Sequence, residues 1–473
     1  MTYRRSLVVV LAFAMVTLSA ACGSRLSDEE RALVLSGGQG GDGGLAVGEG
    51  GDGVASDVTG TGGEESGTDG AAPADGATGG DDGGGTAGGE GGDTGGEGSQ
   101  CAPGSATGPG VSPTEIKVGN VSQLSGLVPK FGQTGVNGVK AYFNMINNQG
   151  GVCGRKLSLV VADDRFQSAQ NRAETEKLAP SVIAFVGNVS VVDDGGAPII
   201  DEKGVADISL ATTPPRIAAK NNFPPNPIDP TPGAGVGLTK ILEYFKRTDG
   251  ISKPAIFYQD VATGVNQSNA YKTDFERAGI PVVATYPVAP TATNFRSQAN
   301  DMKEKGIDFV ITVAEVNAMA NLARAFGEVD YFPKVPFYGA QVYGQKFIQL
   351  AGPNAEGTRV GLIFAIPEEA ASVPGMAAFS TWYGRTAPGA DADFFAILGW
   401  VAADMFVTAL RQAGPDPSQA NILEQMRTFT EYTGNGIVAP INPAQKQLTT
   451  CFHIIKIEGG KWSKEFPGQG FQC

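Results

Sequence analysis

The sequence predicts an α/β protein built from two lobes, each a parallel β-sheet covered by helices. Short apolar runs of strand character alternate with segments whose apolar residues recur at helical spacing, from about residue 113 to the end of the chain. This repeated strand–helix–strand order favours parallel sheets. The alternation is interrupted at residues 221–232, where five of twelve residues are proline, and then restarts. A body of about 360 residues is too large for one compact core and suits two.

Residues 1–21 have the pattern of an export signal. Arg4 and Arg5 precede an apolar run, residues 7–18, that is too short to span a bilayer. Small residues then lead to Cys22 in LSAAC, which resembles the lipobox of bacterial lipoproteins. The resemblance implies that Cys22 is acylated and anchors the chain to the extracytoplasmic face of the cell membrane. A secreted protein cleaved near Ala21 is the alternative.

A linker is expected from residue 22 to residue 109. Residues 40–100 hold 26 Gly and 13 Asp or Glu but no Lys or Arg. Such a composition cannot bury enough apolar surface to order itself. The linker accounts for nearly all of the formal net charge of −14, since the residues after Gln100 sum to −2. The acidity therefore does not indicate a cationic partner, and the folded part has no basic patch to suggest nucleic acid.

Four cysteines remain after Cys22, an even number in an exported chain, which favours disulfides. Of the three possible pairings we favour the two between nearer neighbours, Cys101–Cys153 and Cys451–Cys473. Metal binding is less favoured, because the chain has no C-x-x-C spacing and its single histidine, His453, lies in a strand-like run.

The first array of elements begins with a strand over residues 115–121. The following helix, residues 135–148, places Val136, Val139 and Phe143 on one face. The array continues with a strand at 157–162, a helix through 169–178, a strand at 182–186, a helix around 197–200 and a strand around 205–210.

The second array begins with a helix over residues 238–245. It continues with a strand at 255–258, a helix ending over 270–277, a strand at 281–286, a helix ending over 300–305, a strand at 309–313, a helix including 319–326 and a strand at 335–338. A strand at 359–366, helices around 398–410 and 422–429, and a hairpin of 451–457 with 461–463 complete the chain.

Hydroxyl and amide side chains gather where these strands end. Ser190 follows one strand of the first array and Thr213 the next. In an open parallel sheet, ligands bind beyond the carboxyl ends of the strands. Ser and Thr at such positions also cap helices, and the two interpretations are equally favoured. In the second array Asp260 and Gln341 follow strands, and the aromatic residues Phe131 and Tyr258 lie close by.

Side chains for catalysis are scarce. The single histidine, His453, lies in a strand-like run, so the chain offers few residues for a Ser-His-Asp or Cys-His site. Neither G-x-S-x-G nor a Walker A loop occurs. Asp163 and Asp164 could be metal or acid–base carboxylates, but a role in ordering the turn that follows their strand is favoured. A non-enzymatic protein without cofactor or metal is therefore expected, and an extracellular hydrolase is the least favoured function.

Two runs, EIKVGNVSQLSG and FGQTGVNGVKAYFNMINNQGGVCGRKLSLVVADD, resemble the opening of the type I periplasmic binding proteins of ABC transporters, in particular the Leu/Ile/Val-binding group. AFVGNVS, ADISLATTPP, AIFYQD, GIDFVITVAEV and FYGAQVYG follow in the family's order, so that the resemblance covers about residues 113–462. It implies two Rossmann-like αβα lobes joined by three crossings that act as a hinge. Lobe one would comprise residues 113–228 and 367–434, lobe two residues 232–363 and 440–473, with crossings near 225–232, 363–367 and 434–440.

The resemblance also implies a site between the lobes. Lobe one would hold a ligand carboxylate through hydroxyl and backbone N–H groups, and lobe two would hold an ammonium group. Gln341 stands where an acid is usual and cannot supply its charge, so Glu315 is the candidate partner for a cation. The full candidate set is Phe131, Ser190, Val191, Ala211, Thr213, Tyr258, Thr263, Glu315 and Gln341.

The function implied is that of an extracytoplasmic solute-binding lipoprotein, which delivers a small ligand to the permease subunits of an ABC importer. A carboxylate without the amine, an amide, and an amino acid held by Glu315 all remain open as ligands. The alternative function is a ligand-sensing receptor module that signals to a membrane partner, because one fold serves both.

Overall fold

The computed structural model describes residues 101–473 except 103, 127–130 and 228–236. The expected signal peptide, Cys22 and most of the linker lie outside these residues. All described residues belong to one of the two compact units of the chain, Gly92–Cys473. Two β-sheets organise this unit, and the expected α/β architecture is confirmed.

The first sheet has four parallel strands in the order β2-β1-β3-β4. Alternate residues of its strands enter two cores: Val118 and Val186 face one, and Val121 and Phe185 face the other. Its strands are β1 (Glu115–Ser122), β2 (Lys156–Asp163), β3 (Ala184–Val186) and β4 (Ala206–Ile208).

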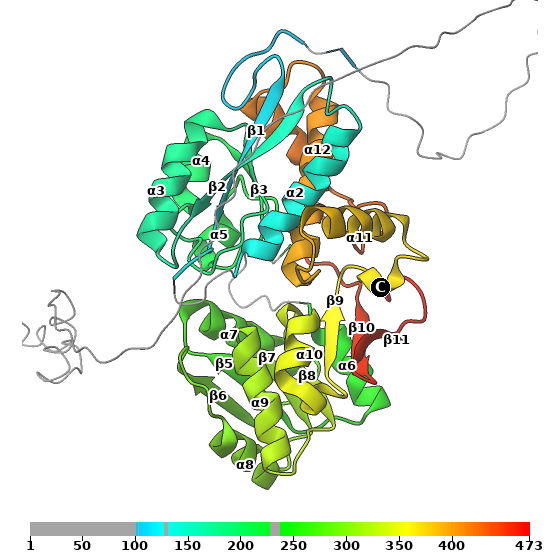
Figure 1. Cartoon of the computed structure of the whole chain (residues 1–473). Helices are drawn as coiled ribbons and strands as arrows, with labels where there is room; N and C mark the ends of the chain where they lie inside the picture. The colour runs from blue at the N-terminus through cyan, green and yellow to red at the C-terminus, as the bar shows by residue number, and fades with distance from the viewer. Residues whose placement is uncertain (1–100, 103, 127–130, 228–236) are drawn as a thin grey trace, which may run out of the picture. The chain divides into compact units, whose positions relative to one another are not determined.

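Helices cover both faces of this sheet (Figure 1). One core contains residues of α3 (Ser168–Leu178) and α4 (Ala197–Lys203), and the other contains residues of α2 (Gln133–Asn148) and α12 (Phe394–Ala413). We call this sheet and its helices lobe one. Its further helices are α5 (Pro214–Ala218), α11 (Pro374–Thr386) and α13 (Gln419–Met426).

The second sheet has seven strands in the order β11-β10-β9-β8-β7-β5-β6. The strands from β5 to β9 pair in parallel, whereas β10 and β11 form the expected antiparallel hairpin at the edge. The strands are β5 (Pro254–Gln259), β6 (Ala284–Val288), β7 (Phe309–Val313), β8 (Val335–Phe337), β9 (Arg359–Leu362), β10 (His453–Glu458) and β11 (Lys461–Phe466).

This second sheet and its helices form lobe two. One face packs on α6 (Thr239–Thr248) and α7 (Ala262–Arg277), and the other on α8 (Arg296–Lys305), α9 (Val316–Glu328) and α10 (Gln345–Ala351). Short 3-10 turns lie at Ala179–Ser181, Ala340–Val342, Gly352–Ala355 and Pro367–Glu369. Helices α5, α10 and α11 were not expected from the sequence, because none of them carries a long apolar stripe.

Two of the expected crossings lie side by side. The N–H of Ala439 donates to the carbonyl of Ile363 over 2.7 Å, and the N–H of Ala365 donates to that of Ile437 over 2.7 Å. Beyond this pair, Lys446 Nζ donates to the carbonyls of Ile217 and Ala219, in lobe one. These bonds join the chain around Lys446 to lobe one, later than the boundary expected at residue 440.

The last residues of the expected linker, before position 109, are attached to lobe one. Gly104 donates its N–H to the carbonyl of Pro415, and its own carbonyl accepts from the buried guanidinium of Arg155 over 2.8 Å. A disulfide joins Cys101 to Cys153, and a second joins Cys451 to Cys473. Both pairings are those favoured from the sequence.

Candidate ligand-binding site

A cavity of about 320 Å³ is lined by residues of both lobes. Each of the nine strands from β1 to β9 contributes a lining residue at or just beyond its carboxyl end, namely Gln123, Phe166, Val191, Leu210, Gln259, Pro290, Val313, Ala340 and Ile363. Convergence of strand ends is the usual origin of a binding crevice in α/β proteins, and the volume suits a small organic molecule.

Six of the nine candidate residues line this cavity: Phe131, Val191, Ala211, Thr263, Glu315 and Gln341. Ser190, Thr213 and Tyr258 do not. Tyr258 packs on the core beneath α6 and α7, and its strand neighbour Gln259 lines the cavity instead, because successive side chains of a strand point to opposite faces.

The hydroxyls of Ser190 and Thr213 are buried and bonded within the protein. Ser190 Oγ accepts from the N–H of Val192 over 3.1 Å. Thr213 donates its hydroxyl to Asp193 Oδ1 over 2.5 Å and its N–H to the same oxygen over 3.0 Å. The N–H of Thr212, which does line the cavity, donates to Asp193 Oδ2 over 2.7 Å. The donors of Thr213, which were expected to hold a ligand carboxylate, are thus bonded to a carboxylate of the protein itself.

Asp193 is 3% exposed, and its charge state follows from its surroundings. Burial raises the pKa of Asp193 to about 6, while the Arg216 guanidinium and the hydrogen bonds from Thr213 and Thr212 oppose that rise. The carboxyl group is therefore largely ionised at neutral pH, and it places a negative charge behind the lobe-one wall of the cavity.

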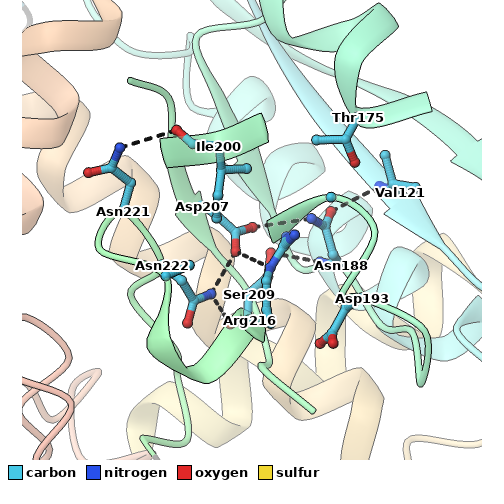
Figure 2. A network of polar contacts seen from close by, with 12 residues as sticks. Val121, Thr175, Asn188, Asp193, Ile200, Asp207, Ser209, Arg216, Asn221 and Asn222 are labelled. Carbon is cyan, nitrogen blue, oxygen red and sulfur yellow. Dashed lines mark hydrogen bonds and ion pairs between the residues drawn. The ribbon is translucent and has the colours of Figure 1, made fainter. Parts of the chain in front are cut away.

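Arg216 belongs to a buried polar network beside Asp193 (Figure 2). Its Nε lies 2.9 Å from Asp207 Oδ2, and both side chains are at most 2% exposed. Asp207 also accepts from Asn188 over 3.2 Å and from Asn222 over 2.6 Å. Several donors thus compensate the Asp207 carboxylate, as a buried charge requires.

The loop after β2 holds Phe166 in the cavity wall. Arg165 and Phe166 have positive φ angles of 55° and 61°, which non-glycine residues seldom adopt. Asp163 Oδ1 accepts from the N–H of Arg165 over 2.9 Å, and Asp164 Oδ1 accepts from that of Phe166 over 3.0 Å. The aspartate pair therefore orders a turn, as favoured from the sequence.

Aromatic rings line the lobe-one side of the cavity. Phe131 meets Phe395 edge to face at a centroid distance of 4.8 Å, and Phe395 meets Phe394 at 5.1 Å. Phe394 and Phe395 open α12, whose N-terminus is capped by Asp393 accepting from the N–H of Ala396. These rings offer apolar surface rather than charge to a ligand.

The polar side chains of lobe two are partly committed to the fold. Gln259 Oε1 accepts from the N–H of Glu315 over 3.0 Å, and Gln341 donates to the carbonyl of Ala314 over 2.9 Å. Glu315 caps α9: its carboxylate accepts from the N–H groups of Asn317 and Ala318 and from the Asn317 amide, over 2.6 to 2.8 Å. A ligand cation would have to compete with these three donors for the Glu315 carboxylate.

Among the described residues, no Lys, Arg or His lines the cavity. A smaller adjoining cavity of about 170 Å³ shares Asn226, Tyr271, Ala340, Ile363, Phe394 and Thr449 with it and is otherwise largely apolar. Within the same described part of the chain, no group of three or more His, Cys, Asp or Glu is placed to hold a metal ion.

Several lining residues were missed from the sequence, notably Phe166, Phe394 and Phe395. An aromatic residue just beyond a strand that ends in two aspartates could have indicated Phe166. Phe394 and Phe395, at the start of α12, have the sequence pattern of core residues because α12 is apolar throughout. By length and composition alone this helix could cross a membrane, yet 83% of its most apolar stretch is buried inside the fold.

Known protein families and proteins match a stretch of this chain that spans both lobes. A family model described as periplasmic binding protein matches residues 115–461. The chain belongs to the periplasmic binding protein family. Leu/Ile/Val-binding protein homolog 3 of Brucella melitensis is 22% identical over 316 residues, 66% of this chain and 83% of that protein. The resemblance stated from the sequence is thereby confirmed.

Solved structures of periplasmic binding proteins share the fold. A fatty acid ABC transporter substrate-binding protein from Thermomonospora curvata superposes with a TM-score of 0.66 at 21% identity, covering 77% of this chain and 94% of its own. A branched-chain amino acid ABC transporter protein from Thermus thermophilus with bound valine gives 0.64 at 16% identity, covering 76% and 97%. At these identities the likeness shows the fold alone, so the ligand has to be argued from this chain's own cavity.

Proposed function

We propose that this periplasmic binding protein is the extracytoplasmic solute-binding subunit of an ABC importer, anchored by lipid at Cys22. Its ligand is a small molecule, amino-acid-like or a related carboxylate or amide, bound between the lobes and released to permease subunits. The observation that carries the proposal is the cavity to which all nine strands from β1 to β9 contribute their carboxyl ends. Relatives named for branched-chain amino acids and a structural neighbour named for a fatty acid support a small organic ligand.

The arrangement of polar and apolar groups supports binding rather than catalysis. Gln259 and Gln341 in the cavity wall are bonded to backbone groups and Glu315 caps a helix, and no acid–base pair faces a nucleophile there among the described residues. The antiparallel pairing of residues 363–365 with residues 437–439 joins two of the crossings, which supports a hinge in which these two segments move together.

The test is a thermal-shift screen of the mature protein against amino acids, carboxylates and amides. A ligand should raise the melting temperature progressively with its concentration, as mass action on the native state requires. Absence of any shift across the panel, together with native mass spectrometry that finds no co-purified molecule, would contradict the proposal.

Localisation and partner choice need their own measurements. Cys22→Ala should move the chain from the membrane fraction to the soluble extracytoplasmic fraction. Ligand uptake that depends on a permease and an ATPase supports transport, whereas a ligand response through a receptor kinase without uptake would identify the sensing alternative.

A further inference from the structure

We infer that the cavity selects an uncharged, largely apolar ligand and rejects carboxylates, because Asp193 already occupies the Thr212 and Thr213 donors of lobe one. This inference rests on the proposed binding function and specifies its ligand class. Four observations carry it: the bonds of Asp193, the absence of a lining cation, the capped carboxylate of Glu315 and the aromatic wall.

The first observation concerns the donors at the ends of β3 and β4. Three of them, the hydroxyl and N–H of Thr213 and the N–H of Thr212, converge on the two oxygens of Asp193 over 2.5 to 3.0 Å. A second carboxylate at this place would compete for the same protons and would face the charge of Asp193 in a poorly solvated setting, where repulsion is strong.

The second observation concerns the available cations. The three buried cations found in the described part of lobe one, Arg155, Arg216 and Lys446, line neither cavity. Arg216 is paired with Asp207, and Lys446 Nζ donates to the carbonyls of Ile217 and Ala219 over 2.6 and 2.5 Å. A bound anion would therefore find no described cationic side chain in the cavity wall to compensate it.

The third observation argues against a cationic ligand. Glu315 is the one described acid in the cavity wall, and three donors at the N-terminus of α9 hold its carboxylate. A helix N-terminus itself favours that negative charge. A ligand ammonium would have to draw the carboxylate away from its cap.

The remaining wall fits a neutral ligand. Phe131, Phe166, Phe394, Phe395, Val191 and Leu210 present apolar surface. Among the described residues no hydrogen bond takes the N–H of Val191 or of Ala211, which leaves two neutral donors at the cavity. A carbonyl or hydroxyl oxygen can use such donors without bringing a charge into the site.

Probes that share an apolar part and differ in the charge of their polar group test the inference. The mature protein is titrated calorimetrically with 4-methylpentanamide, 4-methylpentanoate and 3-methylbutylamine, and with benzamide, benzoate and benzylamine. We expect the amide of each set to bind at least about tenfold more tightly than its carboxylate, since burying an unpaired charge beside a like charge is costly. We expect a similar preference over the amine, because the Glu315 carboxylate is held by the cap of α9. Tightest binding of a carboxylate or an amine would overturn the inference and leave the proposed function standing.

An Asp193→Ser variant tests the cause. It removes the internal carboxylate and frees the N–H of Thr212, which lines the cavity, so the carboxylate probes should gain at least about tenfold in affinity while the amides gain little. Asp194→Asn is the matched control, because the neighbouring Asp194 accepts from Ser168 and does not line the cavity; its probe selectivity should equal that of the wild type. No gain for the carboxylates in a folded Asp193→Ser protein would contradict the role assigned to Asp193. Failure of every probe, with no co-purified ligand, would instead remove the proposed function and this inference with it.

Discussion

At the scale of single residues, the chemistry of the cavity is decided by side chains that do not themselves face the ligand. Asp193 is buried, yet it determines which donors at the strand ends remain available. Asp163 and Asp164 likewise act through the backbone of the next two residues and hold Phe166 in the wall. Residues that position a neighbour are therefore as informative here as residues that touch a ligand.

Phe166→Ala is expected to weaken ligand binding at least about tenfold, because one ring of a largely apolar wall is removed. Affinity for the tightest-binding probe is measured by titration calorimetry. Phe332→Ala is the control, since Phe332 is 51% exposed and lies outside the cavity wall. Equal affinities of Phe166→Ala and wild type would show that the ring does not contact the ligand.

His453 gives the stability of the protein a defined pH dependence. Burial lowers the pKa of His453 to about 4, against the attraction of Glu369, whose Oε2 lies 3.6 Å from Nδ1. The unfolded chain, with an ordinary histidine pKa near 6.5, therefore binds more protons than the native state between pH 6.5 and pH 4. The contribution of His453 to the free energy of unfolding is fully present above pH 6.5, and it falls by about 3 kcal/mol as the pH drops from 6.5 to 4.

The measurement compares wild type with His453→Gln by denaturant unfolding at several pH values. As the pH falls from 6.5 to 4, the wild type should lose stability relative to His453→Gln. The titration of other groups cancels in the difference between the two free energies of unfolding. A pH-independent difference would mean that the imidazole is not held neutral.

At the scale of elements, the contact of α2 with α12 sets the geometry of lobe one. The two helices meet at glycines, which allow their backbones to approach closely: a Cβ at Gly399 would stand 2.1 Å from the carbonyl oxygen of Gly135, and one at Gly138 would stand 2.1 Å from that of Ala396. Because Phe394 and Phe395 open α12, this contact also positions the aromatic wall of the cavity.

Gly399→Ala is expected to destabilise the fold by about 1 to 3 kcal/mol, since the added methyl group forces the helices apart. Gly384→Ala is the matched control in α11, where a Cβ meets nothing within 4 Å; it should be neutral or stabilise by up to about 1 kcal/mol through helix propensity. Both values come from urea unfolding. Similar values for the two variants would contradict the close approach.

At the scale of the whole molecule, the two lobes each supply half of a wall that neither could complete alone. Lobe one supplies the four phenylalanine rings of the wall, and lobe two supplies most of its amides and a capped carboxylate. The strand-like pairing of residues 363–365 with residues 437–439 joins two of the crossings into one unit. The expected response to a ligand is therefore a movement of one lobe against the other about this unit.

Closure should be visible in solution. Saturation with the tightest-binding probe is expected to reduce the radius of gyration measured by small-angle X-ray scattering, and to add about 2.7 kcal/mol to the free energy of unfolding at a free concentration one hundred times Kd. Phe166→Ala at the same concentration serves as a comparison, because weaker binding should give a smaller change. Stabilisation without compaction would indicate binding to a rigid cleft.

The sequence by itself determined the α/β class and the order of most elements. It also favoured the disulfide pairing that the structure has, and it predicted a binding site beyond the strand ends. These features depend on local periodicity, on proline and glycine, and on the direction of parallel strands, all of which are written along the chain. Only the tertiary structure decided which residues face the cavity. Thr213 is bonded to Asp193, Gln259 faces the cavity in place of Tyr258, and Phe394 and Phe395 reach the wall from more than 180 residues away from Val191 and Leu210. The reason is physical: a hydroxyl, an amide or a ring has several partners of similar energy, and the choice among them is made by groups that are distant in sequence and meet only when the sheets and helices pack.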